Sequence, residues 1–215
     1  MKKYLTEFIG TFFLVFSIGM AATSGNPLAP LAIGLTLMVM VYMGGHVSGA
    51  HYNPAVTVGI FMRGKIGASE IGPYIAAQIA GALVASGAVH FLTGEAFAPA
   101  PGGGAGVVEV LLAEIIFTFA LMLVVLNVAT SKATEGNSYY GLAIGFTVTA
   151  GAFAVGPISG GAFNPAVGTG PILANVAMGA ERAASDISNL WYYWAGPLAG
   201  AVLATTVFNM QNPEG

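Results

Sequence analysis

The sequence predicts an all-α membrane protein in which six transmembrane helices and two re-entrant half-helices form an inverted repeat. Three observations support this fold class: the composition, six long apolar segments, and a short polar motif that occurs twice. Of the 215 residues, 56% are hydrophobic and only 7% are charged. Soluble domains carry about 25% charged residues, so this chain has too few to cover a globular surface with hydrated groups.

Six apolar stretches are long enough to cross the bilayer, because about 20 helical residues span roughly 30 Å of hydrocarbon. They are residues 4–23, 28–47, 70–93, 107–130, 139–157 and 189–209. Two further apolar pieces, 53–62 and 164–174, are only half as long and begin at Asn-Pro. We expect these two to enter the membrane without crossing it.

The basic residues predict the orientation. With six spans, five of them fall on one side and only Arg182 lies opposite; the five are Lys2, Lys3, Arg63, Lys65 and Lys132. The positive-inside rule then places both termini in the cytoplasm and loop 93–106 outside, where we expect it to be mobile. We interpret residues 1–215 as one domain of two repeats, about 1–95 and 107–215, and the compact chain with its Lys-rich start favours a prokaryotic inner membrane.

The two halves match in three places. "LTEFIGTFFLV" parallels "LAEIIFTFALM" and pairs Glu7 with Glu114, "SGAHYNPAV" (48–56) parallels "SGGAFNPAV" (159–167), and "YIAAQIAGALVA" parallels "YWAGPLAGAVLA". Three spans separate corresponding segments, so the second half is inverted relative to the first. Inverted repeats place a site near the midplane, and both transporters and channels use them.

The repeated Asn-Pro-Ala motif indicates a helix start, because Asn is a strong N-cap and Pro is tolerated in the first turn. Inversion brings the two starts together, and their dipoles then repel cations while the Asn amides donate to a passing oxygen. The motif residues are Asn53, Pro54, Ala55, Asn164, Pro165 and Ala166. Nonhelical backbone at membrane depth must be buried or line water, so we expect a pore lined by the backbone of Gly49, Ala50, His51, Gly160 and Ala162.

The paired motifs, the Glu in the first and fourth spans, and "AGPLAGA" in the sixth closely resemble the aquaporin family, also called major intrinsic proteins. The resemblance covers nearly the whole chain. It implies a pore within each subunit, a homotetramer in the lipid bilayer, and passive conduction of water or small neutral solutes. It also implies that Glu7 and Glu114 accept hydrogen bonds from the re-entrant loops, with proton coupling as the alternative. We group His46 with them as a buried structural residue, with gating as a weaker alternative.

Most of the family has an Arg directly after the second motif, where this chain has Val167. The family's spacing assigns the other filter positions to Ile33, Ala152 and Gly161. A filter without charge or ring predicts passage of water and larger uncharged solutes, either polyols or metalloid acids such as arsenous (arsenite), boric or silicic acid. The alternatives are a strictly water-selective channel and, less favoured because the family's Arg and a following Asp are absent, a glycerol facilitator.

Several other classes are disfavoured. The chain has no Cys, which excludes disulfides and thiolate metal sites and predicts insensitivity to mercurials. We expect no cofactor, no metal and no nucleic acid partner, because the three His lack ligand spacing and no basic cluster occurs. No nucleophile–base pair supports an enzyme. A secondary transporter would need charges at the midplane, and a structural junction would have a closed pore.

Overall fold

The computed structural model describes residues 1–212, and this part of the chain is helical, without a strand. A short 3-10 helix, η1 (Lys132–Thr134), follows the fifth α-helix. The α-helices are α1 (Lys2–Thr23), α2 (Ala29–Ser48), α3 (Pro54–Met62), α4 (Ala68–Thr93), α5 (Val107–Thr130), α6 (Tyr140–Ser159), α7 (Pro165–Ala177), α8 (Ala183–Asn189) and α9 (Tyr192–Gln211).

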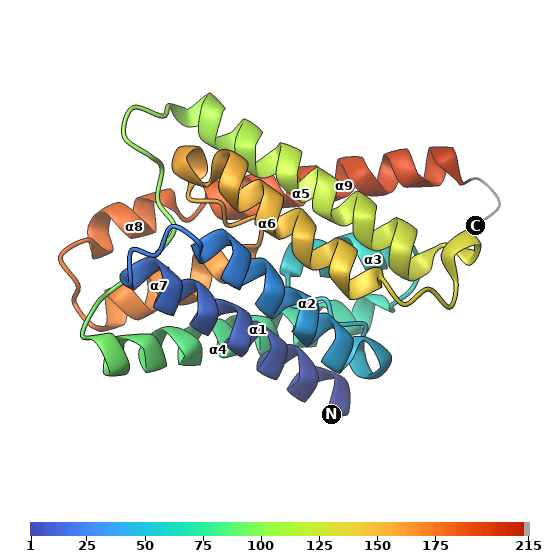
Figure 1. Ribbon diagram of the computed structural model, residues 1–215, viewed down its shortest axis with the longest axis horizontal. Coiled ribbons are helices and arrows are strands. Elements are labelled where there is room, and N and C mark those ends of the chain that lie inside the picture. The colour runs from blue at the N-terminus through green and yellow to red at the C-terminus, as the bar shows by residue number, and fades with distance from the viewer. Residues whose placement is uncertain (213–215) are drawn as a thin grey trace.

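Six of these helices form the membrane-spanning bundle. In the described chain, five helices are long and apolar enough to cross a membrane: α1, α2, α4, α5 and α6. The sixth, α9, is less apolar but has 20 residues, about 30 Å at 1.5 Å per residue. It packs along α5 as α4 packs along α1, so its place in the fold makes it the sixth span (Figure 1).

The half-helices α3 and α7 enter the bundle from opposite ends and contact each other inside it (Figure 1). The helix bounds agree with the predicted segments to within a few residues, and α7 extends to Ala177, beyond the predicted end at 174. Helix α8, after α7, was not predicted. It has only seven residues, mostly polar or small, which is too short for a helical period to be visible in the sequence.

The loop between the halves, residues 93–106, is held in place, so the expectation of a mobile segment was wrong. The carbonyls of Phe97 and Ala98 accept hydrogen bonds from the side chains of Asn175 (3.2 Å) and Arg182 (3.1 Å). The N–H of Gly102 donates to a carbonyl near the end of α6. Phe97 is 6% exposed. The Gly and Pro content that suggested mobility instead lets the backbone lie close against its neighbours.

The span pairs α1–α4 and α5–α9 approach each other closely through glycine. A Cβ at Gly81 of α4 would lie 2.4 Å from the Phe8 carbonyl oxygen of α1, and one at Gly200 of α9 would lie 2.5 Å from that of Ile115 in α5. Small residues of this kind allow membrane helices to pack backbone against backbone. The two contacts occupy equivalent places in the inverted repeat.

Replacing Gly81 with alanine tests this contact. We expect Gly81→Ala to lower the stability of the detergent-solubilised protein by about 1–3 kcal/mol, because the added methyl group meets backbone that cannot rotate away. The unfolding midpoint by circular dichroism measures the change. Gly87→Ala is the matched control, because Gly87 lies on the same helix with nothing within 4 Å of its Cβ position. Equal midpoints for the two variants would contradict the packing argument.

Candidate functional site

A cavity of about 1290 Å³ runs between the helices. At one end it is lined by Lys3 at the start of α1 and by Lys132 after α5, and at the other by residues of loop 93–106 and by Arg182. Asn53 and Asn164 line it between these ends. Figure 1 shows loop 93–106 and α8 together at the end of the bundle opposite the start of α1. The cavity therefore follows the length of the bundle from one side to the other.

Each half-helix begins in the way the motif predicts. Asn53 has extended backbone, and its side-chain oxygen accepts from the Ala55 N–H at 2.9 Å. Asn164 caps α7 identically through Ala166, also at 2.9 Å. The prolines occupy the first helical position, where a missing N–H removes no hydrogen bond. The two positive helix ends therefore face the centre of the cavity.

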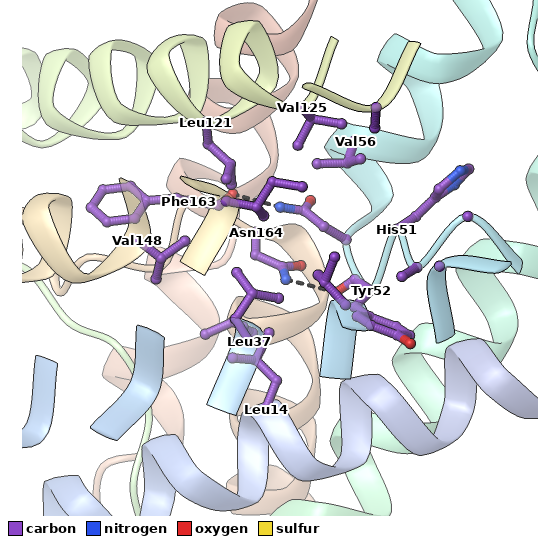
Figure 2. A pocket seen from close by; sticks show the side chains of 18 of the residues that line it. Leu14, Leu37, His51, Tyr52, Val56, Leu121, Val125, Val148, Phe163 and Asn164 are labelled. Carbon is purple, nitrogen blue, oxygen red and sulfur yellow. Dashed lines mark hydrogen bonds between the residues drawn. The ribbon is translucent and has the colours of Figure 1, made fainter. Parts of the chain in front are cut away.

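The two motifs are also bonded to each other. The Asn53 amide nitrogen donates to the carbonyl of Phe163 at 2.8 Å, and the Asn164 amide nitrogen donates to the carbonyl of Tyr52 at 2.9 Å. Figure 2 draws these two bonds as dashed lines. An amide carries two N–H groups, so one on each Asn is used to join the halves. The second finds no acceptor in the described protein and is available to an oxygen in the cavity.

Two buried carboxylates hold the nonhelical loops that precede the motifs. Glu7 accepts from the N–H groups of His51 (3.0 Å) and Tyr52 (2.7 Å). Glu114 accepts from those of Ala162 (3.0 Å) and Phe163 (2.7 Å). Both carboxylates are 0% exposed, and neither lines the cavity. Their hydrogen bonds satisfy backbone donors that no water in the bilayer core would reach.

These bonds fix the direction of the loop carbonyls. In a trans peptide the C=O points opposite to the N–H, and the described chain has no cis peptide bond. The N–H groups that face the two carboxylates therefore turn the preceding carbonyls away from them, toward the cavity. These are the carbonyls of Ala50, His51, Gly161 and Ala162, and all four residues line the cavity. The loops thus present a row of acceptors on each side of the Asn pair.

Sequence reasoning missed four residues that complete the two loops, one serine and one tyrosine for each. The hydroxyl groups of Ser48 and Ser159 donate to the buried carboxylates, both at 2.7 Å. Tyr74 and Tyr193 in turn donate to the carbonyls of these serines, both at 2.7 Å. The signal was present in the sequence, since the repeat aligns Ser48 with Ser159 and Tyr74 with Tyr193. Identical polar residues at equivalent places in two apolar halves indicate a shared structural role.

The two histidines near the first loop have different environments. His51 is 6% exposed, lies 3.1 Å from the Thr57 hydroxyl and packs against the Tyr74 ring. His46, predicted to be buried, is exposed, so that prediction was wrong. It lies in the last turn of α2, where the helix reaches the cavity mouth and a surface hollow beside Lys3 and Glu70.

The four positions predicted as a filter come from four different segments and all line the cavity. Ile33 lies on α2, Ala152 on α6, Gly161 in the second loop and Val167 on α7. Val167 is 3% exposed. Gly161 has φ +62°, a conformation that residues with a side chain adopt at a cost. No charged or aromatic group belongs to this set.

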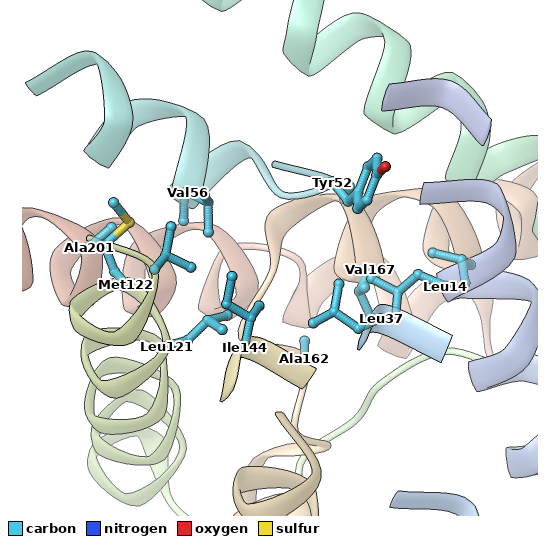
Figure 3. Close-up of a cluster of buried hydrophobic side chains, with 14 of the residues drawn as sticks. Leu14, Leu37, Tyr52, Val56, Leu121, Met122, Ile144, Ala162, Val167 and Ala201 are labelled. Atoms are coloured by element: carbon cyan, nitrogen blue, oxygen red, sulfur yellow. The ribbon is translucent and has the colours of Figure 1, made fainter. Parts of the chain in front are cut away.

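The cavity wall around the Asn pair is apolar, and sequence reasoning did not identify its other members. Leu37 follows Ile33 by four residues and Val148 precedes Ala152 by four, so each lies on the same helix face as its filter neighbour. Figure 2 shows Leu37, Val148 and Leu121 around Asn164, and Figure 3 shows how such side chains gather between the helices.

The repeat gives the filter a counterpart on the other side of the Asn pair. The alignment of the halves relates Ile33 to Ile144 and Val167 to Val56. It also relates Ala152 to Val41, and Gly161 to Ala50. All four counterparts line the cavity. A permeating molecule therefore meets two similar apolar rings, separated by the amides and carbonyls at the centre.

Removing one carboxylate oxygen tests the role of Glu114. We expect Glu114→Gln to lower stability by about 1–3 kcal/mol, because one of three buried donors then faces an amide N–H₂ instead of an acceptor. Thermal unfolding in detergent measures this loss. Glu109→Gln, an exposed change in the first turn of the same helix, is the control and should leave the midpoint unchanged. A midpoint for Glu114→Gln equal to that of the control would refute the structural role.

Comparison with known proteins agrees with this geometry. The family model described as "Major intrinsic protein" matches residues 1–208. Aquaporin NIP1-3 of Oryza sativa is 40% identical over 222 residues, covering 97% of this chain and 73% of that protein. Aquaporin NIP1-1 of Zea mays is 35% identical over 221 residues, covering 98% and 74%.

A solved structure shares the whole arrangement. The aquaglyceroporin from Plasmodium falciparum superimposes with a TM-score of 0.85 at 25% identity, covering 97% of this chain and 95% of that one. The helical bundle, the paired half-helices and the relatives found along nearly the full length lead to one conclusion. The chain belongs to the major intrinsic protein family, the aquaporins.

Proposed function

We propose that this aquaporin-family channel conducts water and also larger uncharged solutes, because its filter is wide and apolar. The observation that carries the proposal is the set of residues at the filter positions. Ile33, Ala152, Gly161 and Val167 line the cavity without a charge, a ring or a side-chain donor. Channels of this kind select by pore width and by the donors in the wall.

The chemistry of the wall suggests which solutes pass. The loop carbonyls accept hydrogen bonds and the Asn amides donate them, while the apolar rings exclude ions that cannot shed their hydration. Small molecules that carry several hydroxyl groups and no charge suit this lining. Polyols and undissociated arsenous, boric and silicic acids belong to this class. The name of the Plasmodium falciparum aquaglyceroporin supports a route for solutes beyond water in a related fold.

The arrangement of charges argues against coupled transport. Glu7 and Glu114 are fully bonded to the loops and do not line the cavity, so neither is placed to bind a coupling ion. The cavity also extends along the whole bundle, unlike the closed pore of a purely structural junction. Members of this family are channels and not enzymes.

The proposal includes the setting of the channel. The start of α1 and the end of α9 lie toward the same side of the bundle, and loop 93–106 lies at the other (Figure 1). Five of the six basic residues belong to segments on the side of the termini, which supports cytoplasmic termini in an inner membrane. A homotetramer, the usual assembly of the family, is the oligomer we propose.

Adding the family's arginine tests the wide filter. We expect wild-type proteoliposomes to take up glycerol or arsenous acid, and Val167→Arg to reduce this flux by about tenfold, or about 1.4 kcal/mol of added barrier. Water flux should persist. Stopped-flow light scattering measures the shrinkage in sucrose and the reswelling in glycerol, and direct uptake measures arsenite.

Val167→Met separates size from charge, because it adds bulk to the same position without a donor. Solute flux in this variant between those of wild type and Val167→Arg would show that width and charge both contribute. If the wild type passes water but neither solute, the proposal is wrong. The protein is then a strictly water-selective channel that works without the family's arginine at position 167.

A cysteine at the same position tests whether Val167 lines the conducting path. The chain has no Cys, so wild-type water flux should be unaffected by mercuric chloride. Val167→Cys should become sensitive, because a mercury adduct there would occupy the cavity. Ile116→Cys is the control, since Ile116 is 56% exposed on the outer face of α5 and does not line the cavity. Equal sensitivity of the two variants would place Val167 outside the pore.

A further inference from the structure

Arg182 lies at the cavity mouth that loop 93–106 borders. It is the only charged residue at this end among the described residues that line the cavity. It follows α7 and occupies the N-cap position of α8. In the sequence it is the one basic residue predicted to face the outside, with nothing to suggest a contact with the pore.

The side chain is held on one edge and open on the other. Nε donates to Asp186 at 2.9 Å, and Nη2 donates to the carbonyl of Ala98 at 3.1 Å. Asp186 is 1% exposed and also accepts from Asn175 at 2.7 Å. The N–H groups on Nη1 have no acceptor in the described chain. The guanidinium is therefore fixed in direction while keeping donors for a ligand in the cavity.

The ion pair presents its positive end to the cavity. Arg182 lines the cavity, whereas Asp186 does not and lies behind it in the protein. The Arg182 side chain is 36% exposed, so solvent and salt weaken its field without removing it. Its position is fixed by three separate segments: the turn after α7, the first turn of α8 and loop 93–106.

We propose that Arg182 determines the specificity of the channel at its outer mouth, where its guanidinium repels cations and offers hydrogen-bond donors to neutral oxygen-bearing solutes. The filter itself supplies no charge, because Val167 occupies the position next to the second motif. Between the mouth at loop 93–106 and the centre of the cavity, a wide apolar filter leaves only the half-helix dipoles to oppose cations. Arg182 adds the positive end of an ion pair at the entrance, outside the filter, where a solute is still partly hydrated.

The test compares cation leak and water flux in the same proteoliposomes. The double variant Arg182→Gln/Asp186→Asn removes both charges, so that no buried carboxylate is left without its partner. A potential-sensitive dye under a NaCl gradient reports the Na⁺ leak, and stopped-flow light scattering reports water. We expect the Na⁺ leak to rise about two- to threefold, because the double variant removes an ion pair whose positive end faces the cavity, and such a pair acts on an ion as a dipole and not as a net unit charge.

Two variants distinguish charge from mechanical support. Arg182→Lys keeps the charge but not the forked geometry, and should leak like wild type if charge is what matters. Lys2→Gln is the matched control for lost positive charge, since Lys2 does not line the cavity, and should leak like wild type. Low leak in both, with high leak in the double variant, supports the proposal.

Other outcomes overturn it. An unchanged Na⁺ leak in the double variant, with normal water flux, would show that Arg182 only holds loop 93–106 in place. A leak in Arg182→Lys as large as in the double variant would also show that the charge of Arg182 does not limit the cation leak. If the double variant loses water flux, Arg182→Gln alone takes its place, since its amide can still donate to the Ala98 carbonyl. The inference rests on the proposed apolar filter, but it is judged by ion leak and water flux, so a failure of solute uptake would be seen separately.

Discussion

The structure depends on one constraint, which is that backbone groups at membrane depth must find partners inside the protein. The two loops that break the apolar segments expose N–H groups where no water is available. Glu7 and Glu114 accept those hydrogen bonds, and one serine and one tyrosine complete each loop. Because the N–H groups turn toward the carboxylates, the carbonyls turn toward the cavity. The loop N–H groups bond to the buried carboxylates on the side away from the cavity. This arrangement places the carbonyl acceptors on the surface of the pore.

Along the cavity, polar and apolar layers alternate. The Asn amides and the loop carbonyls form the centre, and an apolar ring lies on each side of it, with charged residues at the two mouths. The rings correspond to each other through the repeat, but the mouths do not: Lys3 and Lys132 border one, Arg182 the other. The inner path is therefore nearly symmetric, whereas the entrances differ. The difference in charge between the two directions of approach therefore lies at the ends.

The sequence was sufficient for the helices, the half-helices and the loop residues, because composition, segment length and two copies of one motif all indicate the same fold. The sequence was insufficient where a residue's environment depends on contacts between segments that lie far apart in the chain. Loop 93–106 looked mobile from its Gly and Pro, yet Phe97 is bonded to Asn175 across the molecule. His46 lies in a helix that is apolar almost all round, so periodicity gives no indication of which face meets the cavity. The filter positions were predicted from the family's spacing. Leu37 and Val148, which line the cavity one helical turn from Ile33 and Ala152, were not predicted.

The bonds between the two motifs have a consequence for biosynthesis. Asn53 donates to a carbonyl 110 residues further along the chain, and Asn164 donates back to the residue before Asn53. While the ribosome is still making the second half, α3 has its cap but lacks its opposing helix and the acceptor for its amide. Until the second half is present, the Asn53 amide near the middle of the membrane lacks the Phe163 carbonyl as its acceptor. A product truncated before the second motif would lack the acceptor for Asn53 and the part of the cavity wall that Asn164 and Val167 supply.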